Sequence, residues 1–303
     1  MMSTENMNND EMETITSTET EQALAMSFDG FDIQVGEVKE VIVAETGYNT
    51  DCRVYIPEGD GPFPMLFFIH GGAFVGGFNI LDEGTCRQFC SQAGVVVISP
   101  NYQLAPAAKY PVALNELTVM YKYFLAHADE YRINPSRLAI GGSSAGANYC
   151  TALAQMIAEE GLDKPELMIL MYPTVDLYTD HETMNTPENN YAQIIDAYTE
   201  PGTDLKDPMI SAVYAEDFTV FPRTCIFSGR LDALWDEGKR FADLLANAGV
   251  EVLYKSYAGM GHGFLELAGY EKTGRSAKNM AVSELKSVFA DQKVSAGTCA
   301  AAL

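Results

Sequence analysis

Short apolar runs and longer segments with helical spacing alternate along most of this chain. The consecutive residues Met65, Leu66, Phe67, Phe68 and Ile69 are all apolar, which is typical of a strand buried on both faces of a sheet. In residues 113–131, apolar side chains recur every three or four positions, which predicts an amphipathic helix. This alternation predicts an α/β fold, with a mostly parallel central sheet and helices on both of its faces.

The pattern gives a position for each of these elements. The predicted strands are residues 41–43, 54–56, 65–69, 95–99, 138–141, 167–171, 224–227 and 250–257. The predicted helices are residues 81–93, 113–131, 147–158, 234–248 and 276–289.

Two acidic segments depart from the alternation. Residues 1–27 hold six acidic residues and no basic one, and we expect a weakly ordered N-terminal arm, with a short helix beginning near Ala23. Residues 174–219 hold ten acidic residues and one basic residue, Lys206, for a net charge of −9. A segment of this length is too long for a plain connection. We therefore expect residues 28–303 to form one domain with a cap or lid inserted at about residues 174–219.

The overall charge excludes some classes of partner. Acidic residues outnumber basic residues by 42 to 19, for a formal net charge of −23, so we expect neither nucleic acid nor a membrane surface as a partner. No apolar run approaches the roughly 20 residues of a membrane span. No export signal is visible at the N-terminus, so we expect a cytoplasmic protein. The six cysteines are scattered, without metal-ligand spacing, and we expect reduced thiols and no metal.

A serine lies at the centre of the sequence Gly142-Ser143-Ser144-Ala145-Gly146, between a predicted strand and a predicted helix. A tight strand-to-helix turn of this type lifts the serine hydroxyl above the sheet, and the glycines allow close backbone approach. The start of the helix adds a partial positive charge where an oxyanion would form. Ser144 is therefore a candidate nucleophile, although the same pattern also fits a packed glycine-rich loop.

A second glycine-rich loop follows the strand at residues 65–69. It reads His70-Gly71-Gly72-Ala73-Phe74. Two consecutive glycines leave their N–H groups free to point into a site, as an oxyanion hole requires. An ordinary turn is the alternative interpretation.

A histidine base for Ser144 can be found by elimination. The chain has four histidines. His70 belongs to the glycine loop, His127 lies in a predicted helix and His181 lies in the acidic insertion. His262 is flanked by glycines in a loop just after a predicted strand, where a base could reach the serine. We therefore predict that His262 is the base.

The acid that would orient this base has two candidates. Asp232 follows the strand at residues 224–227, at the sheet edge where catalytic groups of open α/β sheets lie. Asp236 is one helical turn further on. Asp232 also precedes a predicted helix, so capping that helix is its alternative role.

The chain resembles the hormone-sensitive-lipase-like branch of the α/β-hydrolases, which includes bacterial esterases. The matching stretches, in order over roughly residues 50–292, are HGGAF (70–74), YQLAP (102–106), GSSAGAN (142–148), Asp207-Pro208 with Ser211, DALWDEG (232–238) and HGF (262–264). Ala73, Gln103 and Ser143 depart from the residues usual in the branch, which are Gly, Arg, and Asp or Thr. None of the three belongs to the triad, and Gln103 is expected to remove a structural ion pair.

The resemblance implies an α/β-hydrolase catalytic domain at residues 28–303. It also implies roles for six residues: nucleophile Ser144, acid Asp232, base His262, and oxyanion N–H donors Gly71, Gly72 and Ala145. The order of serine, aspartate and histidine along the chain is that of the α/β-hydrolases.

These residues predict a carboxylic ester hydrolase that acts on a small-molecule ester through an acyl-enzyme on Ser144 and needs no cofactor. The acidic insertion favours uncharged esters with short to medium acyl chains, unless its charges are only a solvated face. An amide-cleaving hydrolase (a formamidase or peptidase-like enzyme) and a ligand-binding pseudoenzyme are the alternatives. The oligomeric state stays open, a homodimer included.

Overall fold

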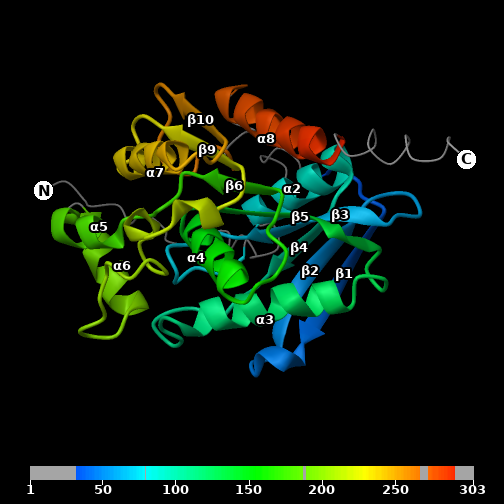
Figure 1. The fold of residues 1–303 in the computed structure, drawn as a ribbon, viewed down its shortest axis with the longest axis horizontal. Coiled ribbons are helices and arrows are strands. Elements are labelled where there is room, and N and C mark those ends of the chain that lie inside the picture. The colour runs from blue at the N-terminus through cyan, green and yellow to red at the C-terminus, as the bar shows by residue number, and fades with distance from the viewer. Residues whose placement is uncertain (1–31, 79, 187–188, 267–271, 291–303) are drawn as a thin grey trace, which may run out of the picture.

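A computed structural model describes residues 32–78, 80–186, 189–266 and 272–290 (Figure 1). The expected N-terminal arm at residues 1–27 and its short helix near Ala23 lie outside the described residues, as does Cys299. In the described ranges, no helix is both long enough and apolar enough to cross a membrane.

An eight-stranded sheet forms the centre of the molecule. Its strands are β1 (Glu37–Val43), β2 (Thr50–Ile56), β3 (Phe63–Ile69), β4 (Val96–Pro100), β5 (Ile133–Ser143), β6 (Leu167–Met171), β9 (Thr224–Gly229) and β10 (Val252–Tyr257). They lie in the order β1-β2-β4-β3-β5-β6-β9-β10, and β2 is antiparallel to both of its neighbours. The pairs from β4 to β10 are parallel, so the predicted mostly parallel sheet is confirmed.

Helices cover both faces of the sheet (Figure 1). They are α2 (Ile80–Gln88), continued by a π-helical turn at Phe89–Gly94, then α3 (Val112–Ala126), α4 (Ala145–Glu159), α7 (Trp235–Asn247) and α8 (Lys272–Ala290). Side chains of α3, α4 and α7 pack into the hydrophobic cluster on one face. Those of α2 and α8 pack into the cluster on the other face.

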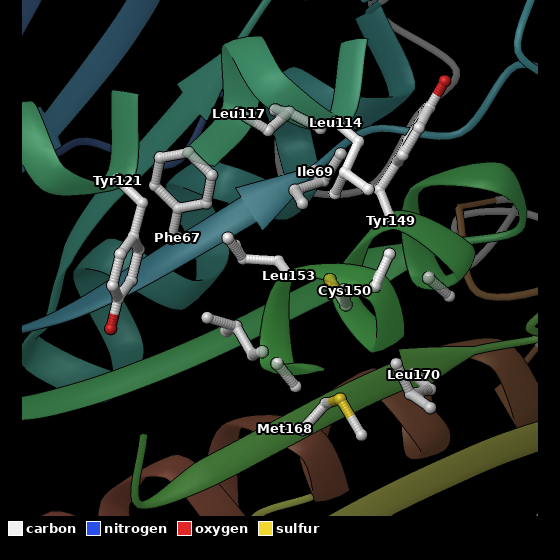
Figure 2. Packing of buried hydrophobic residues seen from close by; sticks show 14 of the residues in the cluster. Phe67, Ile69, Leu114, Leu117, Tyr121, Tyr149, Cys150, Leu153, Met168 and Leu170 are labelled. Carbon is white, nitrogen blue, oxygen red and sulfur yellow. The ribbon is translucent and has the colours of Figure 1, made fainter. Parts of the chain in front are cut away.

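Strand β3 shows why an apolar run predicts a central strand. Phe67 and Ile69 point into the cluster beneath α3 and α4, whereas Leu66 and Phe68 point into the opposite cluster. Figure 2 shows Phe67 beside Tyr121 of α3, with ring centroids 5.6 Å apart. Fully burying a side chain of this size contributes about 1.5–3 kcal/mol, so β3 needs apolar residues at consecutive positions.

The helix predicted at residues 113–131 is shorter in the structure. Helix α3 ends at Ala126, and β5 begins at Ile133 rather than at Leu138. Between them the chain turns, with Arg132 at a positive φ of 58°. Tyr131 is buried in this turn and therefore extends the apolar pattern past the end of the helix.

The Glu116 carboxylate fixes the backbone at Gln103. The buried carboxylate of Glu116 in α3 accepts a hydrogen bond from the Gln103 N–H at 2.8 Å and another from the Thr50 hydroxyl. Burial raises the pKa of Glu116. Glu116 thus ties the loop after β4 to the core without a guanidinium partner from position 103.

The acidic segment at residues 174–219 has its own short elements. They are α5 (Leu177–Thr183), β7 (Asn185–Thr186), β8 (Asn189–Asn190), α6 (Tyr191–Tyr198) and 3-10 turns at Ala212–Tyr214 and Phe218–Val220. The Asp176 carboxylate caps α5 by accepting the Thr179 N–H. At the end of α6, the Tyr198 ring stacks on Phe74 with centroids 3.9 Å apart. This contact anchors the segment on the loop after β3.

Candidate active site

Ser144 sits on the sharp turn between β5 and α4. Its φ is +53°, in the left-handed region that non-glycine residues rarely adopt. The flanking glycines explain how the turn closes: a Cβ on Gly142 would lie 2.6 Å from the Ile69 carbonyl oxygen, and one on Gly146 only 2.0 Å from it. Neither position can carry a side chain, so the spacing of the two glycines is a steric requirement of this turn.

The structure brings His262 to Ser144. His262 lies in the loop after β10, and its Nε2 is 2.9 Å from the Ser144 Oγ. The His262 side chain is 44% exposed, and its ring packs against the Tyr172 ring with centroids 4.8 Å apart. The imidazole is therefore held on one side and open to the solvent on the other.

The structure also brings Asp232 to His262. The Asp232 Oδ2 lies 2.9 Å from the His262 Nδ1, and the carboxylate is almost completely buried. Its Oδ1 accepts the N–H of Leu234 just before α7, so one oxygen orders the helix start and the other faces the histidine. Asp236 lies in the first turn of α7 and is exposed. A proton on Nδ1 would be held by Asp232, which leaves the Nε2 lone pair facing Ser144.

The other three histidines lie in different surroundings. His70 is fully buried and stacks on Tyr102, and burial lowers its pKa to about 4. His127 is exposed and packs on Tyr123. The His181 Nε2 lies 3.0 Å from an Asp196 carboxylate oxygen in the acidic segment.

The loop after β3 presents backbone N–H groups beside Ser144. The N–H groups of Gly71, Gly72 and Ala145 donate to no acceptor among the described residues. Ala145 is the first residue of α4, so its N–H has no partner within the helix. Gly72 has a φ of +122°, and a Cβ there would lie 2.2 Å from the Gly76 carbonyl oxygen. A Cβ on Gly71 would lie 3.4 Å from that of Ser144, which places this loop directly against the serine.

A cavity of about 470 Å³ opens over these groups. Ser144, His262 and the loop residues Gly71, Gly72 and Ala73 form one side of its lining. Tyr191 and Ile194 of α6 contribute from the acidic segment. A ligand in this cavity would contact both the sheet edge and that segment.

Several carboxyl groups are buried near this site although no sequence motif predicts their residues. Asp82 and Glu266 line the cavity, and Lys278 is buried near Glu266.

A second group of buried carboxyl groups lies near Asp232. The Glu237 carboxylate accepts the Asp176 N–H at 2.6 Å, and Asp180 lies close to both residues. Burial and the charge of Asp176 raise the pKa of Asp180 to about 7, and burial and the charge of Asp180 raise that of Glu237.

These raised pKa values predict that the protein loses stability toward alkaline pH. The folded state holds protons on Asp180 and Glu237 that the unfolded chain releases near pH 4. For Asp180 this stabilisation is complete below about pH 4 and lost as pH rises through its folded-state pKa of about 7, and the raised pKa of Glu237 acts in the same direction. We expect the melting temperature to fall by several degrees between about pH 5.5 and about pH 8.5. Asp180→Asn should remove much of this dependence. An equal or higher wild-type melting temperature at the alkaline pH would contradict the prediction.

A family model and similar curated proteins point to the same protein family. A family model described as alpha/beta hydrolase fold matches residues 66–266. The chain is 29% identical over 278 residues to carboxylic ester hydrolase LipN of Mycobacterium tuberculosis, a match that covers 88% of this chain and 74% of LipN. It is 30% identical over 230 residues to carboxylesterase NlhH of the same species, covering 70% and 71% of the two chains.

Solved structures are similar over nearly the whole chain. The hyperthermophilic esterase of the archaeon Pyrobaculum calidifontis matches with a TM-score of 0.80 at 26% identity, over 89% of this chain and 90% of that chain. The thermostable carboxylesterase EstE1, cloned from a metagenomic library, matches with a TM-score of 0.79 at 26% identity, over 89% and 94% of the two chains.

Proposed function

Because this chain belongs to the α/β-hydrolase family, in its hormone-sensitive-lipase-like branch, we propose that it is a carboxylic ester hydrolase with Ser144 as its nucleophile. One observation carries the proposal. The Asp232 carboxylate, the His262 imidazole and the Ser144 hydroxyl form a chain with 2.9 Å at each step. This chain ends beside the N–H groups of Gly71, Gly72 and Ala145.

The reaction follows from these positions. The Ser144 Oγ attacks the ester carbonyl while the His262 Nε2 takes its proton, and Asp232 stabilises the resulting imidazolium. The carbonyl oxygen becomes an oxyanion that the three N–H groups can bind, and one such donor is typically worth about 3 kcal/mol. His262 then protonates the leaving alcohol, and water cleaves the acyl-enzyme with His262 again as the base. No cofactor takes part in this mechanism.

Residues 174–219 are proposed to act as the cap of this domain. Tyr191 and Ile194 reach the cavity from this segment, and Tyr198 stacks on Phe74 beside the proposed oxyanion loop. The cap would therefore shape the acyl or alcohol site while leaving the serine and histidine on the sheet edge. This arrangement assigns the chemistry to residues of the sheet and the choice of substrate to the cap.

The charge of the cap predicts the class of ester. With a net charge of −9 over residues 174–219, the cap should repel a carboxylate on the substrate. We expect kcat/KM for p-nitrophenyl butyrate to exceed that for p-nitrophenyl hemisuccinate, which has the same acyl length, by at least about tenfold at low ionic strength. Added salt should narrow the ratio because it screens the repulsion. Faster cleavage of the hemisuccinate would contradict this substrate class.

The same assays separate esters from amides. Release of p-nitrophenolate from the acetate and butyrate esters is the expected activity. Cleavage of an aryl formamide without cleavage of either ester would replace the proposed function with the amide-cleaving alternative. Binding of these esters without turnover would indicate a pseudoenzyme.

A further inference from the structure

Three charged side chains are buried together next to the proposed catalytic residues. Asp82 of α2 is 3% exposed, Glu266 in the loop after His262 is 7% exposed, and Lys278 of α8 is 1% exposed. Asp82 and Glu266 line the same cavity as Ser144 and His262. Charged side chains are rarely buried to this degree unless they compensate one another.

This cluster lies among the segments that carry His262, Ser144 and the Gly71–Gly72 loop. Glu266 lies four residues after His262, and Asp82 lies in the helix that follows the Gly71–Gly72 loop. Ser143 immediately precedes Ser144, and its hydroxyl would lie 3.1 Å from a Cβ on Gly71. The Ser143 hydroxyl also interacts with the Glu266 carboxyl group and favours its ionised form. The cluster is thus placed to fix the histidine loop relative to the serine turn.

The charge of the cluster depends on Glu266. Burial and the nearby charge of Asp82 raise the pKa of Glu266 to about 8, although Lys278 opposes the shift. Apart from the Ser143 hydroxyl, no hydrogen-bond partner for either oxygen of this carboxyl group is found in the described part of the chain. With Glu266 protonated, Asp82 and Lys278 balance each other. With Glu266 ionised, the formal charges of these three side chains sum to −1.

We propose that Glu266 is a positioning residue that holds the His262 loop against the Ser143–Ser144 turn in its uncharged form and weakens oxyanion binding when it ionises. This inference rests on the proposed esterase function. Negative charge develops on the substrate carbonyl oxygen in the transition state, and a second negative charge behind Ser144 opposes it. Within the described ranges, the charged groups that act on Glu266 are Asp82 from α2 and Lys278 from α8, and β5 contributes the neutral Ser143. His262 lines the same cavity as Glu266.

The pH profile of ester hydrolysis tests this role. For the intact protein with p-nitrophenyl butyrate, we expect kcat/KM to fall about tenfold above about pH 8, where Glu266 ionises. Glu266→Gln is isosteric and cannot ionise, so its profile should stay level where the wild-type profile falls. Glu130→Gln, which removes an exposed carboxylate after α3, is the matched control and should keep the wild-type fall.

A second variant keeps the test decisive if Glu266→Gln does not fold. Asp82→Asn removes the charge that raises the pKa of Glu266, so the alkaline fall should move to lower pH. An active wild-type enzyme without an alkaline fall, or a Glu266→Gln variant with the same fall, would overturn the inference and leave the proposed function intact. Absence of hydrolysis at every pH would overturn both.

Discussion

Replacing Ser144 by alanine is expected to lower kcat/KM for p-nitrophenyl butyrate by about 10⁴-fold to 10⁶-fold. The change removes the Oγ that lies 2.9 Å from the His262 Nε2, and no acyl-enzyme can form without it. The N–H groups beside it would remain and account for residual activity. The assay uses enough protein to detect this residual hydrolysis. Circular dichroism checks that the variant retains the fold.

Retained activity in the folded Ser144→Ala protein would contradict the assignment of the nucleophile. The variant is also informative about binding. Its cavity keeps Tyr191 and Ile194, so the ester should still bind with an affinity close to that of the wild-type protein. Loss of the rate with binding retained would place the effect of Ser144 in the chemical step.

Asp232→Asn is expected to lower kcat by about 10⁴-fold, the magnitude known for the equivalent change in a serine protease. An asparagine amide in this position can present its NH₂ group to Nδ1, which favours the tautomer with the proton on Nε2. The nitrogen that faces Ser144 would then be a donor rather than a base. The effect should appear in kcat rather than KM, and the pH profile should change with it.

Asp236→Asn is the matched control for this experiment. Asp236 is one helical turn away in the same helix start, has the same chemistry and is exposed. We expect its kcat to stay close to that of the wild-type protein. A large loss in Asp236→Asn together with a small loss in Asp232→Asn would reverse the assignment that the 2.9 Å contact to His262 supports.

Most of the sheet could be predicted because its strands are buried on both faces. The run at residues 65–69 needs apolar side chains at every position, as the opposite placements of Phe67 and Phe68 show. The end of α3 could not be predicted in this way. Tyr131 is buried in a turn after the helix, and an apolar residue at helical spacing looks the same in a helix or beyond it.

Some residues of the candidate site could likewise be predicted from the sequence, and others could not. The glycines around Ser144 could be predicted because close backbone packing forbids any side chain there. Asp232 and Asp236 could not be separated by spacing, since both lie near the same sheet edge. The distance from the Asp232 Oδ2 to the His262 Nδ1 is what distinguishes them. Asp82, Glu266 and Lys278 form no pattern along the chain, because only the packing of α2, α8 and the His262 loop brings them together.

Covalent labelling with a p-nitrophenyl phosphonate identifies the nucleophile directly, because the reagent reacts with an activated serine hydroxyl and stays attached to it. We expect one adduct per chain, located by peptide mass spectrometry on Ser144, with esterase activity lost in proportion to labelling and no adduct in Ser144→Ala. An adduct on another residue, or full labelling with activity retained, would contradict the assignment of Ser144 as the nucleophile.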